Sequence, residues 1–143
     1  MNFQGVLMNV ADLDRSIDFY REVFGFTVLS QEEQLAVVTA PQSDHPQVIV
    51  FRAFGGGRIG GARHTGLRAF LLEVESADQL ERIASELDSR GLLVSRRDHS
   101  DWVAVVGHDP DGVAVVVAWR PGGGRITEES WRTLDEFLYG IGE

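Results

Sequence analysis

Residues 9–26 read NVADLDRSIDFYREVFGF. Within this stretch apolar side chains recur every three or four residues, which is the spacing of an amphipathic helix: Leu13, Ile17, Tyr20 and Phe24. Asp12 precedes the run as a helix N-cap, and Gly25 follows it as a C-terminal stop. The hydrophobic pattern of residues 4–10 predicts a strand that ends within the first two residues of this stretch. The stretch therefore predicts a strand that leads directly into a helix of about three turns.

The rest of the chain repeats this order. β-branched or aromatic runs between turn residues predict further strands at 26–30, 34–40, 47–54, 67–74, 92–96, 102–107 and 113–119, with a second helix at 77–90. Matching features recur about 65 residues apart: Val10 and Val74, Gly25 and Gly91, and the two GGGRI runs at 55–59 and 122–126. We interpret the chain as a tandem duplication of one β-α-β-β-β module, at 1–57 and 64–121, followed by a C-terminal helix at 126–140.

Composition narrows the range of partners. The 143 residues include no cysteine, which excludes disulfides and thiolate metal sites. The net charge is −9, so phosphate backbones and anionic lipid are repelled. No apolar run has the roughly 18 residues of a membrane span, and the first residues do not resemble a secretory signal. We expect a cytoplasmic protein whose partners include neither nucleic acid nor a membrane.

Two motifs resemble one family. Residues 9–26 resemble the V-x-D-x-x-x-S-x-x-F-Y…L-G-F opening of the vicinal oxygen chelate superfamily, which includes glyoxalases, bleomycin-resistance proteins and extradiol dioxygenases. Asp98-His99 followed by Asp109-Pro110-Asp111-Gly112 resembles its D-H…D-P-D-G-N ending. The resemblance implies an α+β fold in which two βαβββ modules, each half a barrel, form a cup-shaped cavity. It also implies a homodimer.

Enzymes of this superfamily hold a divalent metal in the cup, where it acts as a Lewis acid. The resemblance places the first ligands of the two modules at Gly5 and Ala69, and the last at Val116. None of these side chains can coordinate a metal, because a divalent ion needs imidazole, carboxylate or amide donors. We therefore expect no cofactor, with a divalent metal at other residues as the alternative.

Two titratable residues are candidates for catalysis. His99 matches the D-H dipeptide of the dioxygenase-like relatives and would act as acid or base near neutral pH. Glu73 shares the strand face of Ala69 and Leu71, so it lines the cup if they do. The competing interpretation is that His99 makes hydrogen bonds at the cavity rim and that Glu73 is a solvated strand end.

A second set of residues suits ligand binding. Aromatic side chains on the predicted strands would stack on an organic ligand: Phe51, Phe70, Trp102 and Trp119. Asn9, Arg52 and Arg68 would supply polar anchors. Core packing explains the aromatic residues equally well, and the two arginines are equally compatible with ordinary surface charges.

Three functions remain open. The first is a metal-free protein that binds or sequesters an aromatic or hydrophobic organic ligand, such as an antibiotic or natural product. The second is a lyase, isomerase or dioxygenase-like enzyme for a small organic substrate, with or without a divalent metal. The third is an interaction scaffold whose C-terminal helix covers a sheet or a partner subunit.

Overall fold

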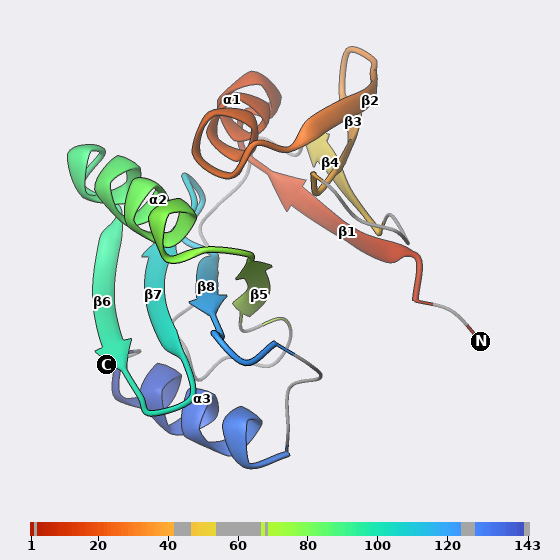
Figure 1. Cartoon of the computed structure of the whole chain (residues 1–143). Helices are drawn as coiled ribbons and strands as arrows, with labels where there is room; N and C mark the ends of the chain where they lie inside the picture. The colour runs from red at the N-terminus through yellow and green to blue at the C-terminus, as the bar shows by residue number, and fades with distance from the viewer. Residues whose placement is uncertain (2, 42–46, 54–66, 68, 124–127, 142–143) are drawn as a thin grey trace. The chain divides into compact units, whose positions relative to one another are not determined.

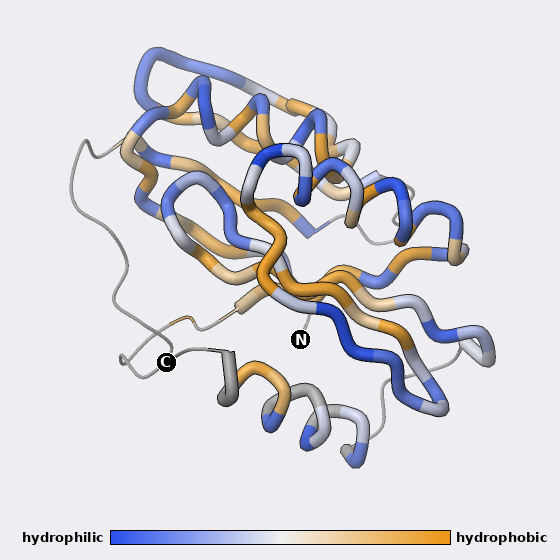
Figure 2. The backbone as a smooth tube through the Cα atoms, turned by 90° about the vertical axis from the view of Figure 1, so that its left-hand side faces the viewer, coloured by the Kyte–Doolittle hydropathy of each residue, from blue (hydrophilic) through white to orange (hydrophobic). Residues whose placement is uncertain are grey.

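The computed structural model describes the chain except residues 2, 42–46, 54–66, 68, 124–127 and 142–143. It divides into two compact units, Met1–Arg58 and Ile59–Glu143, and each contains one four-stranded mixed sheet. Figure 1 follows both units along the chain. Hydrophobic stretches run along the strands, whereas hydrophobic and hydrophilic residues alternate within the turns of the helices that are coloured in Figure 2. Each helix therefore has one face suited to packing on a sheet.

Unit 1 has the predicted β-α-β-β-β order. Its elements are β1 (Gly5–Val10), α1 (Leu13–Phe24), β2 (Thr27–Gln31), β3 (Leu35–Thr39) and β4 (Val48–Ala53). The sheet order is β1-β4-β3-β2, with β1 and β4 parallel and the other pairs antiparallel. The predicted bounds are correct to within one residue at most ends.

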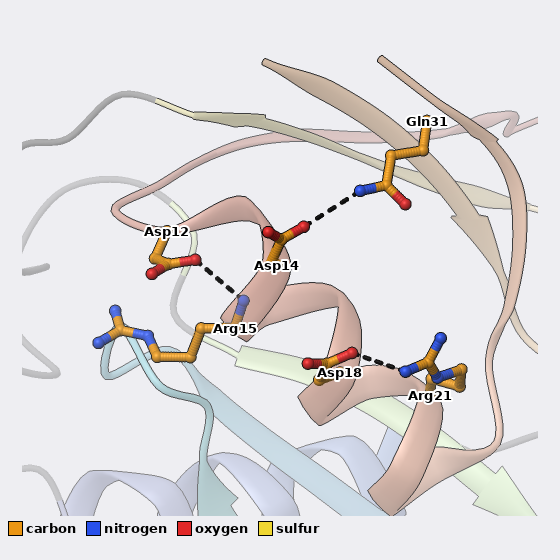
Figure 3. A network of polar contacts seen from close by, with 6 residues as sticks. All are labelled: Asp12, Asp14, Arg15, Asp18, Arg21 and Gln31. Carbon is orange, nitrogen blue, oxygen red and sulfur yellow. Dashed lines mark hydrogen bonds and ion pairs between the residues drawn. The ribbon is translucent and has the colours of Figure 1, made fainter. Parts of the chain in front are cut away.

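Local hydrogen bonds fix both ends of α1. The Asp12 carboxylate accepts a hydrogen bond from the Arg15 backbone N–H at 3.0 Å, as an N-cap does (Figure 3). Gly25 ends the helix in the left-handed region, with φ of 75°. The Gln31 amide donates to Asp14 at 3.1 Å and so connects β2 to the first turn of the helix.

An aromatic cluster forms the core between α1 and its sheet. Tyr20 lies at its centre, with its ring centroid 5.1 Å from that of Phe51 and 5.5 Å from that of Phe26. Met8 and Val10 of β1 are buried on the same side. The aromatic residues of the 9–26 motif thus act in folding, because they hold the helix on the sheet.

Unit 2 repeats the module and adds a third helix. Its elements are β5 (Ala69–Val74), α2 (Ala77–Ser89), β6 (Leu93–Asp98), β7 (Val103–His108), β8 (Ala114–Trp119) and α3 (Glu128–Ile141). The sheet order β5-β8-β7-β6 is that of unit 1, with β5 and β8 parallel. The structure confirms the predicted α+β fold of two βαβββ modules with a C-terminal helix.

The two helices of unit 2 pack on opposite faces of its sheet. The face toward α2 includes Gly107, where a Cβ atom would lie only 2.8 Å from the Leu87 methyl groups. The neighbouring residues on β7, Ala104 and Val106, point the other way and form a cluster with Phe137 of α3. The prediction that the C-terminal helix packs on the sheet is therefore confirmed.

The turn between β7 and β8 is built around a buried carboxylate. Asp109 is 1% exposed, and its Oδ1 accepts hydrogen bonds from the backbone N–H groups of Asp111 and Val113, both at 2.9 Å. Gly112 closes the turn with φ of 92°, which a residue with a side chain rarely adopts. The D-P-D-G motif is thus an architectural element.

Candidate functional site

The sheet of unit 1 has one face that α1 does not cover. Side chains alternate along β1, so Met8 and Val10 point toward α1 while Leu7 and Asn9 point to the opposite face. Leu7 is 76% exposed there. Across the sheet it is in register with Val50 of β4, and Val50 is in register with Val37 of β3. This row of three apolar side chains is called the Leu7 row below.

A polar pair borders the Leu7 row. Asn9 and Arg52 are register partners on β1 and β4, two residues along from Leu7 and Val50, and both are exposed. Neither side chain has a hydrogen bond or ion pair within the described part of the chain. Two of the three polar anchors predicted from the sequence therefore lie side by side, while Arg68 falls outside the described residues.

In unit 2 the corresponding face is covered. A buried hydrophobic cluster lies on this face, and Phe137 of α3 contributes its ring to the cluster. The strands and the turn before β7 contribute the other members: Trp102, Ala104, Val106, Val116 and Ala118. Partly buried hydrophobic side chains pack against this cluster: Ala69, Leu71, Ala114 and Leu138. The face that carries Ala69 and Val116 is thus occupied by the chain's own C-terminal helix.

The positions implied for metal ligands are closed to a metal-binding side chain. At Gly5 a Cβ atom would lie 2.1 Å from the Val48 carbonyl oxygen, so any larger residue would force β1 and β4 apart. Val116 is 2% exposed beneath α3, and Ala69 packs against the same cluster. Elsewhere among the described residues, no three His, Asp or Glu side chains gather as a metal site requires. The residues present do not fit the superfamily's metal.

Unit 2 also contains a pocket beside the β6–β7 turn. Its volume is about 320 Å³, and it is lined by Ser100, Asp101, Arg120, Pro121, Gly122, Gly123 and Ser130. Arg120, whose side chain is 10% exposed, donates through Nε and Nη2 to Glu73 Oε2 at 2.9 and 2.6 Å. Glu73 is therefore the ion-pair partner of a pocket residue. The Glu73 side chain itself is 41% exposed.

His99 lies in the turn that supplies two of the pocket residues. Its ring stacks on Trp102 at 5.1 Å with an interplanar angle of 11°. Its Nδ1 accepts a hydrogen bond from the Asp101 backbone N–H at 3.3 Å, which leaves the neutral ring with its proton on Nε2.

On β6, a hydrogen bond to Glu81 and a second to Asp98 raise the pKa of the Arg96 guanidinium above its ordinary value.

Three of the four aromatic residues predicted as ligand contacts lie on sheet faces opposite the positions implied for the metal ligands. Phe51 is fully buried against Tyr20, on the side of its sheet that α1 covers. Phe70 and Trp119 occupy the opposite face from Ala69 and Ala118, because neighbouring residues on a strand alternate. Only Trp102 of this set lies on the face of the ligand positions. Of the other three, Phe51 belongs to the core, whereas Phe70 and Trp119 are partly exposed.

Sequence reasoning missed two residues that define these sites. Leu7 had a usable signal, since it lies between Gly5 and Asn9 on the same strand face. Arg120 had none, because its partner Glu73 is 47 residues away in the chain.

Comparison with known proteins agrees with this fold. A family model described as the Glyoxalase/Bleomycin resistance protein/Dioxygenase superfamily matches residues 3–117. No curated protein matches the sequence. The chain belongs to the Glyoxalase/Bleomycin resistance protein/Dioxygenase superfamily.

Solved structures share the fold at low sequence identity. A glyoxylase/bleomycin resistance protein/dioxygenase domain from Frankia sp. EAN1pec is 21% identical, covers 85% of this chain and 92% of its own, and has a TM-score of 0.67. Lactoylglutathione lyase from Agrobacterium tumefaciens is 16% identical over 82% and 92%, with a TM-score of 0.61. Oxidase ChaP-H1 is 19% identical over 87% and 99%, with a TM-score of 0.66.

None of the helices in the described residues is long and apolar enough to cross a membrane.

Proposed function

We propose that this chain binds a small organic molecule on the face of the unit 1 sheet that α1 does not cover, without a metal at the superfamily's usual positions. The observation that carries the proposal is the chemistry of those positions. Gly5 has no room for a donor side chain, and Ala69 and Val116 are packed beneath α3. These positions favour binding by direct contact with side chains over chelation by a metal, because chelation needs converging donors.

The size of the Leu7 row defines the apolar part of the ligand. Leu7, Val50 and Val37 come from three neighbouring strands, so the row is about 10 Å long at the usual strand spacing. A fused two-ring aromatic system has this length. Contact with the row would remove the exposed Leu7 side chain from water, which favours binding by the hydrophobic effect.

The polar pair defines the other end of the ligand. Arg52 presents a guanidinium to a carboxylate or phenolate oxygen, and the Asn9 amide can add a further hydrogen bond. The ligand class is thus an aromatic or hydrophobic organic acid, which includes acidic antibiotics and other natural products.

Isothermal titration calorimetry with 2-naphthoate in the presence of EDTA tests this proposal. We expect wild-type protein to bind and Arg52→Met to bind about 10- to 100-fold more weakly, the range of one charge-assisted hydrogen bond. Leu7→Asp should also bind weakly, since it places a carboxylate on the apolar row. Arg21→Met is the matched control, because Arg21 pairs with Asp18 on exposed α1 surface. Absence of 2-naphthoate binding, or equal affinity in Arg52→Met, would contradict the proposal.

An enzyme is the second candidate, and it rests on the pocket of unit 2. His99 lies in the same turn as the pocket residues Ser100 and Asp101. Its Nδ1 accepts a hydrogen bond from the Asp101 backbone N–H, so Nε2–H is the ring group that would take part in proton transfer. The measurement is turnover of small organic substrates by wild-type protein and by His99→Ala. Equal turnover in both proteins would remove His99 from the mechanism.

Homodimerisation, which the superfamily resemblance implies, is part of the proposal. Light scattering at micromolar concentration should give twice the mass of the chain. A monomer would contradict this part.

A further inference from the structure

We infer that the pocket beside the β6–β7 turn binds a small organic amine in its protonated form, and that the Asp101 carboxylate recognises the ammonium group. The pocket lies in unit 2, so the inference does not depend on the ligand proposed for unit 1. It also holds whether or not His99 takes part in catalysis.

The pocket is separate from the positions that the superfamily uses for its metal ligands. Arg120 follows Val116 by four residues, which is about 13 Å of extended chain. Among the described residues, no member of the buried cluster beneath α3 lines the pocket. Most of the described lining residues follow residue 117, where the match to the family model ends: Arg120, Pro121, Gly122, Gly123 and Ser130. The pocket is therefore formed mainly by a C-terminal segment that lies outside the family match.

The charges around the pocket leave one carboxylate unpaired. The guanidinium of Arg120 donates twice to Glu73 Oε2 and once, at 3.4 Å, to the Gly123 carbonyl oxygen. Its positive charge is therefore balanced by Glu73. The exposed Asp101 carboxylate, by contrast, has no hydrogen bond or ion pair to any residue that the structure describes. The pocket thus has one uncompensated negative charge, which attracts a cation.

The β6–β7 turn also provides a hydroxyl acceptor. Because the Asp101 backbone N–H donates to His99 Nδ1, this nitrogen carries no proton in the neutral ring, and the Ser100 hydroxyl donates to it at 3.4 Å. The Ser100 oxygen then keeps its lone pairs for a ligand. An ammonium group has three N–H donors, and the Asp101 carboxylate and the Ser100 oxygen can accept two of them. The third stays in contact with water, since this turn is exposed.

The size of the pocket defines the rest of the ligand. A volume of about 320 Å³ is near the lower end for small-molecule sites, so it suits a single ring. The Pro121 ring and the two glycines that follow it provide apolar surface for that ring. An inorganic cation would leave most of this volume unfilled, and no three His, Asp or Glu side chains gather within the described part of the chain to hold one. The ligand class is therefore a primary amine with one small ring.

Titration with benzylamine and with benzyl alcohol, its uncharged counterpart, tests the inference at neutral pH. In an amide correlation spectrum, benzylamine should shift the resonances of Ser100, Asp101, Gly122 and Gly123. Benzyl alcohol should bind wild-type protein at least about 5-fold more weakly than benzylamine does. Asp101→Asn should weaken benzylamine binding by a similar factor, which is the loss of a charge-assisted hydrogen bond partly screened by water.

Asp88→Asn is the matched control, because it removes the same charge from the exposed surface of α2, which packs on the other face of the sheet. It should bind benzylamine as wild-type protein does. Absence of shifts at the lining residues, equal affinity for the two probes, or equal affinity in Asp101→Asn and Asp88→Asn would overturn the inference. Asp101→Asn should keep its affinity for 2-naphthoate, so failure of this inference is distinguishable from failure of the function proposed for unit 1.

Discussion

The carboxylate of Asp109 gives the sharpest test of whether the D-P-D-G motif acts in folding. Its Oδ1 accepts two backbone hydrogen bonds at 2.9 Å in a site that is 1% exposed. Hydrogen bonds to a charged group each contribute about 1.5–3 kcal/mol, so Asp109→Ala should lower the free energy of unfolding by about 3–6 kcal/mol. Asp109→Asn keeps an acceptor oxygen and should lose less than half of that.

Urea unfolding followed by far-ultraviolet circular dichroism measures these differences. Arg96→Ala is the control, because it removes ion pairs of an exposed arginine with Glu81 and Asp98, which should cost less than about 1 kcal/mol. Binding of 2-naphthoate should not change in folded Asp109→Asn. An Asp109→Ala protein as stable as Arg96→Ala would refute the architectural role of the motif.

Two other substitutions test packing in unit 2. Gly107→Ala places a methyl group 2.8 Å from the Leu87 methyls, so we expect a loss of about 1–3 kcal/mol in urea unfolding; no loss would show that α2 can shift freely. Glu73→Gln removes the carboxylate that pairs with the mostly buried Arg120, which should cost about 1–3 kcal/mol. If Glu73 is instead a solvated strand end, its substitution will leave the unfolding midpoint unchanged.

The fold was predictable because its signals are local. The 9–26 stretch contains an N-cap, an apolar stripe and a left-handed glycine, and each of these acts within one or two helical turns. The repeat of this pattern about 65 residues later then indicates the second module. Even the packing of the C-terminal helix follows from its apolar stripe, since such a stripe must be buried.

The site was only partly predictable, for two physical reasons. Side-chain alternation separates Phe70 from Ala69 and Trp119 from Ala118, and grouping aromatic residues by strand alone ignored this. The second reason is distance along the chain. The pairing of Asn9 with Arg52 and of Glu73 with Arg120 depends on strand register, which no local pattern specifies. The location of Phe137 on the face of Val116 likewise depends on tertiary packing.

The most direct test of ligand binding by unit 1 is an amide chemical-shift map of the protein with 2-naphthoate in EDTA. Binding on the sheet face that α1 does not cover predicts that the largest shifts fall on the Leu7 row and the polar pair, namely Leu7, Asn9, Val37, Val50 and Arg52. The same map should result when Zn²⁺ or Mn²⁺ replaces EDTA, apart from paramagnetic broadening. Shifts confined to unit 2, or binding that appears only with added metal, would contradict the proposed function.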